Sequence, residues 1–298
     1  MTRILLKERL RQGLFFIDGA MGTQLIEAGA PAGCCNDALN IESPEIVKTV
    51  HQKYIDAGVD AVITNTFGAN SLVLKRHGRA DQAQAINRAA AKLAREIAGP
   101  DKYVLGDIGP CGDFLEPLGM VKEDDLKTAF AEQAKSLLDG GVDGFIIETM
   151  TALEEIKVAI EAVQSVCDLP VLVSLAYDPA GGAAKTMMGV SPAQAVEQLA
   201  SLGIAALGFN CGTLDMPGYT ALAKAYAEAL TGTGVLLLAE PNAGRPELEG
   251  DRAVYKLSPE AYAEALAQIK DAGAAILGGC CGTSPAHLKA AIQTIRGG

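Results

Sequence analysis

The chain has 298 residues, of which 49% are hydrophobic, and its 25 basic and 36 acidic residues give a formal net charge of −11. This acidic balance argues against a nucleic-acid partner and favours a small molecule or another protein. No stretch approaches the roughly 20 uncharged apolar residues of a membrane-spanning helix, so a membrane partner is not expected. The charged segment 1–9 does not resemble a secretory signal. We therefore expect a soluble, cytoplasmic protein whose seven cysteines are reduced thiols.

Short apolar runs alternate with amphipathic stretches along the whole chain, after a helix-like opening at 4–12. Eight runs are predicted to be strands: 14–18, 61–65, 103–107, 144–148, 170–176, 205–210, 235–240 and 274–278. Helices between them are expected to begin at Ser43, Ser191 and Ser258, each followed by proline. Glycine is expected in the left-handed C-cap position at Gly58 and Gly141. Eight strand–helix units predict an α/β fold, a single (β/α)8 TIM barrel in one domain, residues 1–298.

Polar residues stand at the ends of nearly all predicted strands, where the active site of such a barrel lies. They are Asp18, Thr64, Asn65, Thr66, Asp107, Glu148, Asn210, Glu240 and Asn242. Four of these residues are carboxylates and would lie close together at one end of the barrel. Their mutual repulsion requires a metal cation or an amine to neutralise it. The glycine-rich turn 18–22 offers backbone amides to a substrate carboxylate.

Three cysteines also stand at predicted strand ends. Cys280 and Cys281 follow the last run, and Cys211 follows an earlier one. Adjacent cysteines do not easily form a disulfide with one another, but both can face one cation. Three thiolates with an open fourth position would make a catalytic zinc site. Zinc held in this way favours binding and alkylation of a substrate thiol. The alternative interpretation is three buried, unreactive cysteines.

These residues occur within longer motifs that resemble the homocysteine S-methyltransferase family. The motifs are Asp18-Gly19-Ala20-Met21-Gly22-Thr23, Thr64-Asn65-Thr66-Phe67, Gly106-Asp107-Ile108-Gly109-Pro110, Glu148-Thr149, Asn210-Cys211, Glu240-Pro241-Asn242-Ala243-Gly244 and Gly278-Gly279-Cys280-Cys281-Gly282-Thr283. The resemblance spans residues 13–296 and is strongest to the homocysteine-binding barrel of cobalamin-dependent methionine synthases. The Gly-Gly-Cys-Cys-Gly-Thr element is its most specific part.

The resemblance implies a reaction and a set of roles. Homocysteine, bound through its thiol to zinc, would take a methyl group from a methyl-corrinoid such as methylcobalamin, and methionine would form. Cys211, Cys280 and Cys281 match the family's zinc ligands, and Asp18 and Glu148 match residues that hold the homocysteine amino group. The remaining expected substrate contacts are Gly19, Ala20, Met21, Thr23, Asn65, Asp107, Asn210, Glu240 and Asn242. The corrinoid would be carried by a partner protein or domain, so the chain is expected to be either an excised domain or a stand-alone enzyme.

Several alternatives remain open at this point. The methyl donor could be betaine or S-methylmethionine, or the barrel could bind zinc and a thiol without turnover within a larger assembly. A Schiff-base lyase or aldolase is disfavoured because no predicted strand ends in lysine. A second adjacent pair, Cys34 and Cys35, is interpreted as part of a surface loop. The glycine-rich segment 178–189 is interpreted as a mobile lid.

Overall fold

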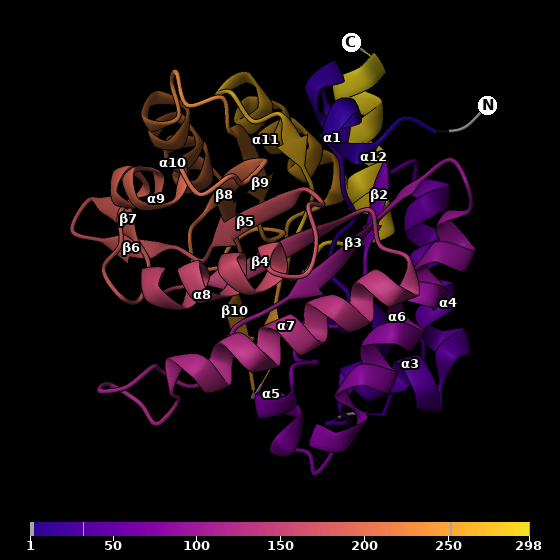
Figure 1. Cartoon of the computed structure of the whole chain (residues 1–298). Helices are drawn as coiled ribbons and strands as arrows, with labels where there is room; N and C mark the ends of the chain where they lie inside the picture. Colours follow the sequence, from indigo (N-terminus) through magenta and orange to yellow (C-terminus); the bar gives the residue numbers. More distant parts are fainter. Residues whose placement is uncertain (1–2, 32, 251, 298) are drawn as a thin grey trace.

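An eight-stranded parallel barrel forms the centre of the molecule (Figure 1). The computed structural model describes residues 3–31, 33–250 and 252–297. The barrel strands are β1 (Phe15–Phe16), β2 (Ala61–Ile63), β3 (Tyr103–Ile108), β4 (Gly144–Met150), β5 (Val171–Leu175), β8 (Ala206–Asn210), β9 (Leu236–Glu240) and β12 (Ile276–Leu277). Their order in the sheet is β1-β12-β9-β8-β5-β4-β3-β2. Every predicted run overlaps one of these strands, so the predicted barrel is confirmed.

The seam between β1 and β2 is closed partly by side chains. The Asp60 backbone N–H donates to the Phe16 carbonyl at 2.7 Å, and the Asp60 carboxylate accepts from the Phe16 N–H at 2.8 Å. Farther along, the Ile63 N–H donates to Asp18 Oδ2 at 3.0 Å. Between β1 and β2, carboxylate oxygens therefore accept backbone N–H groups that would otherwise pair with strand carbonyls. This hydrogen bond also fixes Asp18 at the C-terminal end of β1.

Helices surround the barrel on its outside (Figure 1). The longer ones are α4 (Pro44–Ala57), α6 (Ala83–Ala98), α7 (Glu123–Gly140), α8 (Leu153–Gln164), α9 (Pro192–Leu199), α10 (Met216–Ala229), α11 (Pro259–Asp271) and α12 (Pro285–Gly297). Shorter helices are α1 (Leu6–Arg9), α2 (Gly22–Glu27), α3 (Leu39–Glu42) and α5 (Ser71–Lys75), with 3-10 turns at Leu10–Gln12, Asn36–Ala38 and Ala80–Gln82. The expected starts are confirmed at α4, α9 and α11, and Gly58 and Gly141 take the left-handed C-cap conformation.

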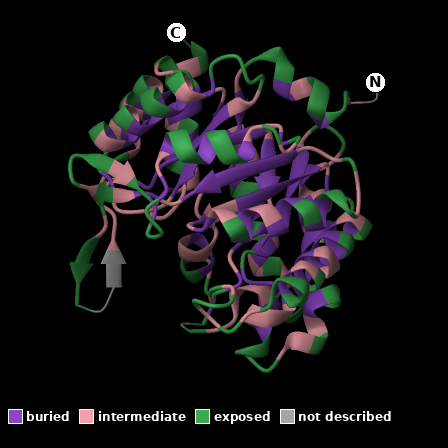
Figure 2. Cartoon of the chain, turned by 60° about the vertical axis from the view of Figure 1, so that its left-hand side comes forward, coloured by how far each residue is buried: buried purple, intermediate pink, exposed green. Residues whose placement is uncertain are grey.

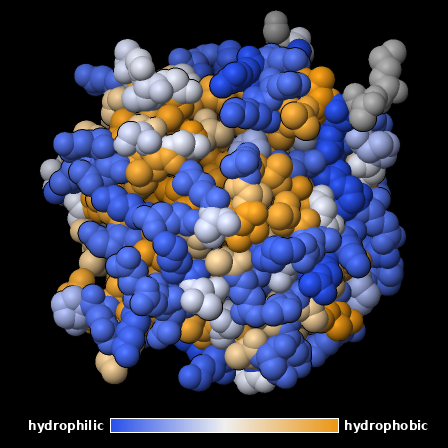
Figure 3. Space-filling view, viewed as in Figure 1, coloured by the Kyte–Doolittle hydropathy of each residue, from blue (hydrophilic) through white to orange (hydrophobic). Residues whose placement is uncertain are grey.

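Buried side chains lie on both sides of the barrel wall, so the strands are almost entirely buried (Figure 2). Inside the barrel, Leu6 and Leu10 from the N-terminal helical segment pack with strand residues such as Phe15 and Ile146. Outside the barrel, the strands and the inner faces of the helices form a second, larger apolar cluster. On the face shown in Figure 3, hydrophilic residues cover most of the outline and apolar residues gather toward the centre.

Two short hairpins extend from the loops that follow barrel strands. The first pairs β6 (Asp178–Ala180) with β7 (Ala183–Lys185), within the segment expected to be a lid. The second pairs β10 (Glu247–Glu249) with β11 (Arg252–Val254). None of the helices in the described ranges combines the length and apolar character needed to cross a membrane.

Candidate functional site

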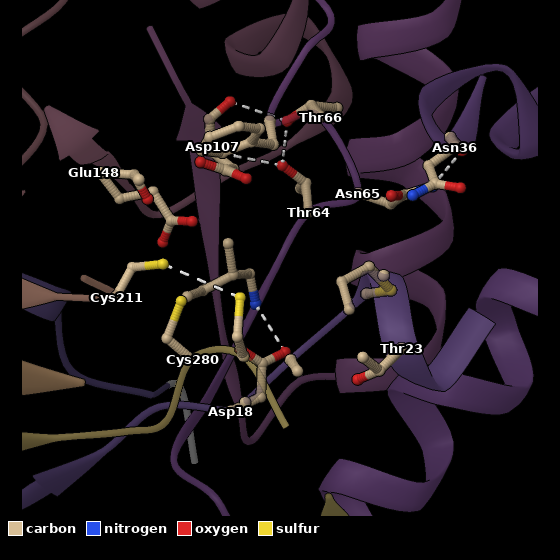
Figure 4. A pocket seen from close by; sticks show the side chains of 18 of the residues that line it. Asp18, Thr23, Asn36, Thr64, Asn65, Thr66, Asp107, Glu148, Cys211 and Cys280 are labelled. Carbon is tan, nitrogen blue, oxygen red and sulfur yellow. Dashed lines mark hydrogen bonds between the residues drawn. The ribbon is translucent and has the colours of Figure 1, made fainter. Parts of the chain in front are cut away.

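A cavity of about 620 Å³ opens at the C-terminal ends of the barrel strands. Its lining includes most of the predicted site residues: Asp18, Gly19, Ala20, Met21, Thr23, Asn65, Asp107, Glu148, Glu240, Cys211, Cys280 and Cys281. Figure 4 shows the sulfur atoms of Cys211 and Cys280 on one side of this cavity, with Thr23 and Asn65 on the other. The parallel arrangement brings together residues that lie far apart in the sequence, because all eight strands end at the same face.

Three thiols form a cluster at one side of the cavity. Cys211 follows β8, whereas Cys280 and Cys281 follow β12, and β9 lies between these strands. The three sulfur atoms lie within 4.8 Å of one another, and the Sγ atoms of Cys211 and Cys281 are 3.8 Å apart. Cys211 has a positive φ of 52°, which is strained for a residue with a side chain. The Tyr219 hydroxyl, which donates to the Cys211 carbonyl at 2.6 Å, holds it there.

The sulfur cluster matches the donor set of a tetrahedral zinc ion. Zinc–sulfur bonds of about 2.3 Å at tetrahedral angles place neighbouring sulfur atoms about 3.8 Å apart, which is the Cys211–Cys281 separation. All seven cysteines of the chain are free thiols, so none of these sulfurs is consumed in a disulfide. The pKa of Cys281 is lowered to about 3, because the Cys211 and Cys280 thiols donate hydrogen bonds to its sulfur. The cluster therefore stabilises one thiolate, at Cys281, while the pKa values of Cys211 and Cys280 are raised, so a soft cation would have to displace their protons.

Four carboxyl groups face the same cavity, and burial raises the pKa of each. The pKa of Glu148 rises to about 7, while those of Asp18, Asp107 and Glu240 rise well above their ordinary range. Desolvation is the main cause in every case, and repulsion between neighbouring acidic groups adds to it for Asp18, Asp107 and Glu240. One buried oxygen of Asp18, of Asp107 and of Glu240 has no hydrogen-bond partner among the residues that the structure describes. Such groups favour a cationic ligand, because an ammonium group would supply both charge and hydrogen bonds.

A further stretch of the cavity wall was not predicted from the sequence. Asn36 and Asp37, in the 3-10 turn Asn36–Ala38, line the cavity together with Ile26 of α2 and Phe67. The Gly68 N–H donates to Asp37 Oδ1 at 3.0 Å, and burial raises the Asp37 pKa to about 6. No strand precedes this turn, so the strand-end pattern gave no signal for it. The neighbouring Cys34 and Cys35 lie in the loop before this turn and are partly buried.

Three of the expected substrate contacts, Ala20, Asn210 and Asn242, have hydrogen-bond partners within the protein. Asn210 and Asn242 stand behind the cavity wall. The Asn210 side chain bonds to Thr149 and Ser174, and its Nδ2 donates to Cys280 Sγ at 3.6 Å. Asn242 Nδ2 donates to the Gly212 carbonyl at 2.8 Å. The Ala20 N–H donates to Thr283 Oγ1 at 3.0 Å, so it is not free to bind a substrate carboxylate.

Comparison with known proteins agrees with this architecture. Methionine synthases from Mycobacterium leprae and Mycobacterium tuberculosis are each 33% identical to the chain, over 95% and 96% of its length. The chain spans only about a quarter of these relatives, 24% and 25% of their respective lengths.

Solved structures support the fold. The metallated form of the homocysteine methyltransferase MmuM from Escherichia coli superposes with a TM-score of 0.77 at 24% identity, covering 94% of this chain and 96% of that one. A methyltransferase from Methanosarcina mazei gives a TM-score of 0.62 at 13% identity, with 98% and 97% coverage. Residues 15–295 match the family model described as homocysteine S-methyltransferase. The chain therefore belongs to the homocysteine S-methyltransferase family.

Proposed function

We propose that this chain is a zinc-dependent methyltransferase that moves a methyl group from a methyl-corrinoid donor to the thiol of L-homocysteine, forming methionine. The observation that carries this proposal is the convergence of three thiols at one side of a cavity lined by buried carboxylates. A thiol substrate that also carries an ammonium group matches both parts of this lining. We further propose that residues 1–298 act as one homocysteine-binding domain in the cytoplasm, where free thiols persist.

Cys211, Cys280 and Cys281 would hold the zinc ion. When bound, zinc supplies a Lewis acid that lowers the pKa of a substrate thiol to below neutrality. The protein's own contribution is to keep the three sulfur atoms in place before the metal arrives. The Asn210 amide supports Cys280, and the Tyr219 hydroxyl supports the strained backbone of Cys211.

Asp18 and Glu148 would bind the substrate ammonium group. Both side chains lie near each other and near the thiols, since the charge on Glu148 raises the pKa of Asp18 and that on Cys281 raises the pKa of Glu148. An ammonium placed between them would favour the ionised carboxylates and offset the cost of burying them. Asp107 and Glu240 add negative potential around this position, which disfavours an anionic group there.

The rim of the cavity supports a large methyl donor. Exposed apolar side chains lie in the segments that follow β1, β2, β3 and β5: Ile26 of α2 and Phe67, which line the cavity, and Leu118, Met120 and Met187, which do not. Phe67 is the one aromatic residue that lines the cavity within the described part of the chain. A quaternary ammonium donor such as betaine is usually held by several aromatic rings. An open apolar rim with a single ring therefore favours a corrinoid on a partner protein or domain.

Turnover with free methylcobalamin tests the proposal. The zinc-loaded protein is mixed with L-homocysteine and methylcobalamin, and cobalamin demethylation and methionine formation are followed with and without a zinc chelator. We expect methionine formation that stops when the chelator is added. Stoichiometric zinc without turnover would contradict the choice of free corrinoid donor, and betaine, S-methylmethionine and a corrinoid protein would then be compared as donors. Homocysteine binding without turnover by any donor would support a non-catalytic thiol-binding module.

A further inference from the structure

β4 contains a bulge at the point where it reaches the cavity. The register of the β4–β5 pairing shifts between Ile147 and Met150. On β5 only Ser174 lies between the residues paired with these two, so Glu148 and Thr149 of β4 stand opposite a single residue. An extra residue bends a strand and redirects its side chains, and bulges of this kind are common beside active sites.

The bulge places two successive side chains of β4 at the cavity. Ile146 packs inside the barrel and Ile147 packs outside it, as the alternation of a regular strand requires. Glu148 and Thr149 then both line the cavity, and Met150 packs outside again. In a regular strand Thr149 would face outward and Met150 inward. The position of Glu148 at the mouth therefore depends on the conformation of this bulge.

The backbone of the bulge is strained. Thr149 has a φ of 61°, in the left-handed region that β-branched residues rarely adopt. Within the described ranges, Cys211 is the one other non-glycine residue with a positive φ. Strained conformations of this kind persist only where the surrounding contacts hold them. The bulge therefore needs a partner that keeps Thr149 in place.

Asn210, the last residue of β8, is that partner. Its Oδ1 accepts hydrogen bonds from the Thr149 N–H and the Ser174 hydroxyl, both at 2.8 Å. Its Nδ2 donates to the Thr149 hydroxyl at 2.7 Å and to Cys280 Sγ at 3.6 Å. The two acceptor positions and the two N–H groups of the amide are thus all used. Asn210 is only 1% exposed, so water does not compete for these bonds.

We infer that Asn210 is a positioning residue that fixes Glu148 relative to the thiol cluster by holding the bulge of β4. The inference rests on the proposed function, in which Glu148 binds the substrate ammonium group and Cys280 holds zinc. A single amide bonds to the residue after Glu148 and to one of the three sulfur atoms, so it joins the two parts of the substrate site. Asn210 does not line the cavity and therefore acts through these residues. A substrate bound at both ends is sensitive to their spacing.

The Asn210→Ala variant tests the inference with two thiols that differ only in the amino group, L-homocysteine and 4-mercaptobutanoate. The dissociation constant of each thiol from the zinc-loaded protein is measured by calorimetry, and their ratio reports what the ammonium group contributes. We expect the preference for homocysteine to fall by about tenfold or more in the variant, because Glu148 loses its fixed position. Zinc content is measured in parallel, since Asn210 also contacts Cys280.

Asn87→Ala serves as the matched control. Asn87 is a buried asparagine of α6 that donates to the Ala69 and Ala83 carbonyls, both at 2.8 Å, and it does not line the cavity. Its replacement also removes two hydrogen bonds of a buried amide. We expect a lower thermal midpoint in this variant and an unchanged preference for homocysteine.

A second pair of variants leaves Asn210 in place, and it decides the question if Asn210→Ala does not fold. Thr149→Val keeps the shape of the side chain and removes the hydroxyl that accepts from Asn210 Nδ2. Thr149→Ser keeps this hydroxyl. We expect the preference for homocysteine to fall in Thr149→Val and to be retained in Thr149→Ser.

The outcomes separate this inference from the proposed function. An unchanged preference in Asn210→Ala, or equal preferences in Thr149→Val and Thr149→Ser, would overturn the role of Asn210 while leaving the proposed substrate site intact. An equal fall in Asn87→Ala would also overturn it, because the effect would then be general. A wild-type protein that binds the two thiols equally, or binds neither, would overturn the proposed ammonium site and this inference with it.

Discussion

Single side chains determine whether the thiol cluster can hold a metal. Cys280 lies within 4.8 Å of the other two thiols of the cluster, and interaction with the Cys211 and Cys281 thiols raises its pKa in the metal-free protein. A cation would displace these protons and bind the sulfur atoms in their place. The three sulfur atoms that share protons in the metal-free protein would therefore be the ligands in the metal-bound protein.

Cys280→Ser is expected to abolish zinc retention and methyl transfer, because a serine hydroxyl is a poor ligand for zinc at neutral pH. Zinc content by metal analysis and methionine formation provide the two measurements. Cys167→Ser is the control, since Cys167 follows α8 and takes no part in the cluster. A Cys280→Ser protein with full metal content and full turnover would refute the ligand assignment.

Asp37 is expected to destabilise the protein at neutral pH, because burial raises its pKa from 3.8 to about 6. The Asp37 carboxyl is neutral in both the folded and the unfolded protein well below pH 4, and it is ionised in both above about pH 6. The loss of folding stability that its ionisation causes therefore grows between these two pH values. A shift of roughly two units corresponds to at most about 3 kcal/mol. Asp37→Asn keeps an oxygen that can accept from the Gly68 N–H, and it should therefore raise the free energy of unfolding at pH 8.

Urea unfolding of wild-type and Asp37→Asn protein at pH 5 and pH 8 measures this difference. The gain from the substitution should be smaller at pH 5 than at pH 8, because the wild-type carboxyl is then mostly protonated in the folded state. If Asp37→Asn raised the free energy of unfolding equally at pH 5 and pH 8, or lowered it at pH 8, the folded protein would not bury a charged Asp37 carboxylate.

At the level of elements, the strands that carry the cysteines depend on close backbone packing. β8 and β9 pair in parallel from Ala206–Leu236 to Asn210–Glu240. Gly208 lies in the middle of β8, where an added Cβ would be 1.7 Å from the Leu238 carbonyl oxygen. β8, which Cys211 follows, can therefore approach β9 this closely only with glycine at position 208.

Gly208→Ala is expected to lower the free energy of unfolding by about 3 kcal/mol or more, because β8 and β9 must separate to admit the methyl group. Chemical denaturation of the purified variant measures the loss. Gly297→Ala is the matched control at the end of α12, where no atom lies within 4 Å of an added Cβ. If both variants unfolded at the wild-type denaturant concentration, the close β8–β9 approach would be wrong.

The sequence predicted all eight barrel strands but not their lengths. Alternation of apolar runs and capped helices is a strong local signal, yet β1 and β12 are only two residues long, against predicted runs of five. Backbone hydrogen bonds continue the pairing beyond both strands, since the Ile17 N–H donates to the Leu277 carbonyl and the Gly279 N–H to the Asp18 carbonyl. The hairpins β6–β7 and β10–β11 were not predicted, since strands of three residues carry too little periodicity to distinguish them from loops.

The candidate site was predictable where its residues end strands. Cys211 and Asp18 stand directly beyond apolar runs, so the topology of a parallel barrel sufficed to bring them together. Asp37 reaches the site through a turn whose path no periodic pattern describes. Asn210 and Asn242 also end or follow strands, yet they face backbone and side-chain partners behind the wall. Which way a strand-end side chain turns depends on these tertiary contacts, which the sequence pattern alone does not contain.

At the scale of the whole molecule, metal and substrate are expected to hold the open end of the barrel together. The cavity lining comes from segments between Asp18 and Cys281, and buried carboxyl groups repel one another within it. A bound cation would relieve that repulsion, so binding should be visible in global stability as well as in activity.

Adding L-homocysteine to the zinc-loaded protein at about 100 times its dissociation constant should stabilise the fold by about 2.7 kcal/mol. For a protein of 298 residues the thermal midpoint should rise by about 4 °C, as measured by differential scanning fluorimetry. L-Homoserine, which has a hydroxyl in place of the thiol, should give a much smaller rise. Equal rises with both amino acids would show that the thiol does not contribute to binding.

The ends of the described chain meet at Asp60, whose carboxylate lies 3.5 Å from Arg9 of α1 and also pairs with Arg296 of α12. Figure 1 shows both ends on the same side of the molecule. Because α12 begins just beyond Cys281 and runs for 13 residues, its far end lies about 20 Å from the mouth. An affinity tag or surface attachment at either end would therefore leave the cavity unobstructed. Conversely, a module fused to the C-terminal end would need a tether of at least about six extended residues before it could begin to face the thiols.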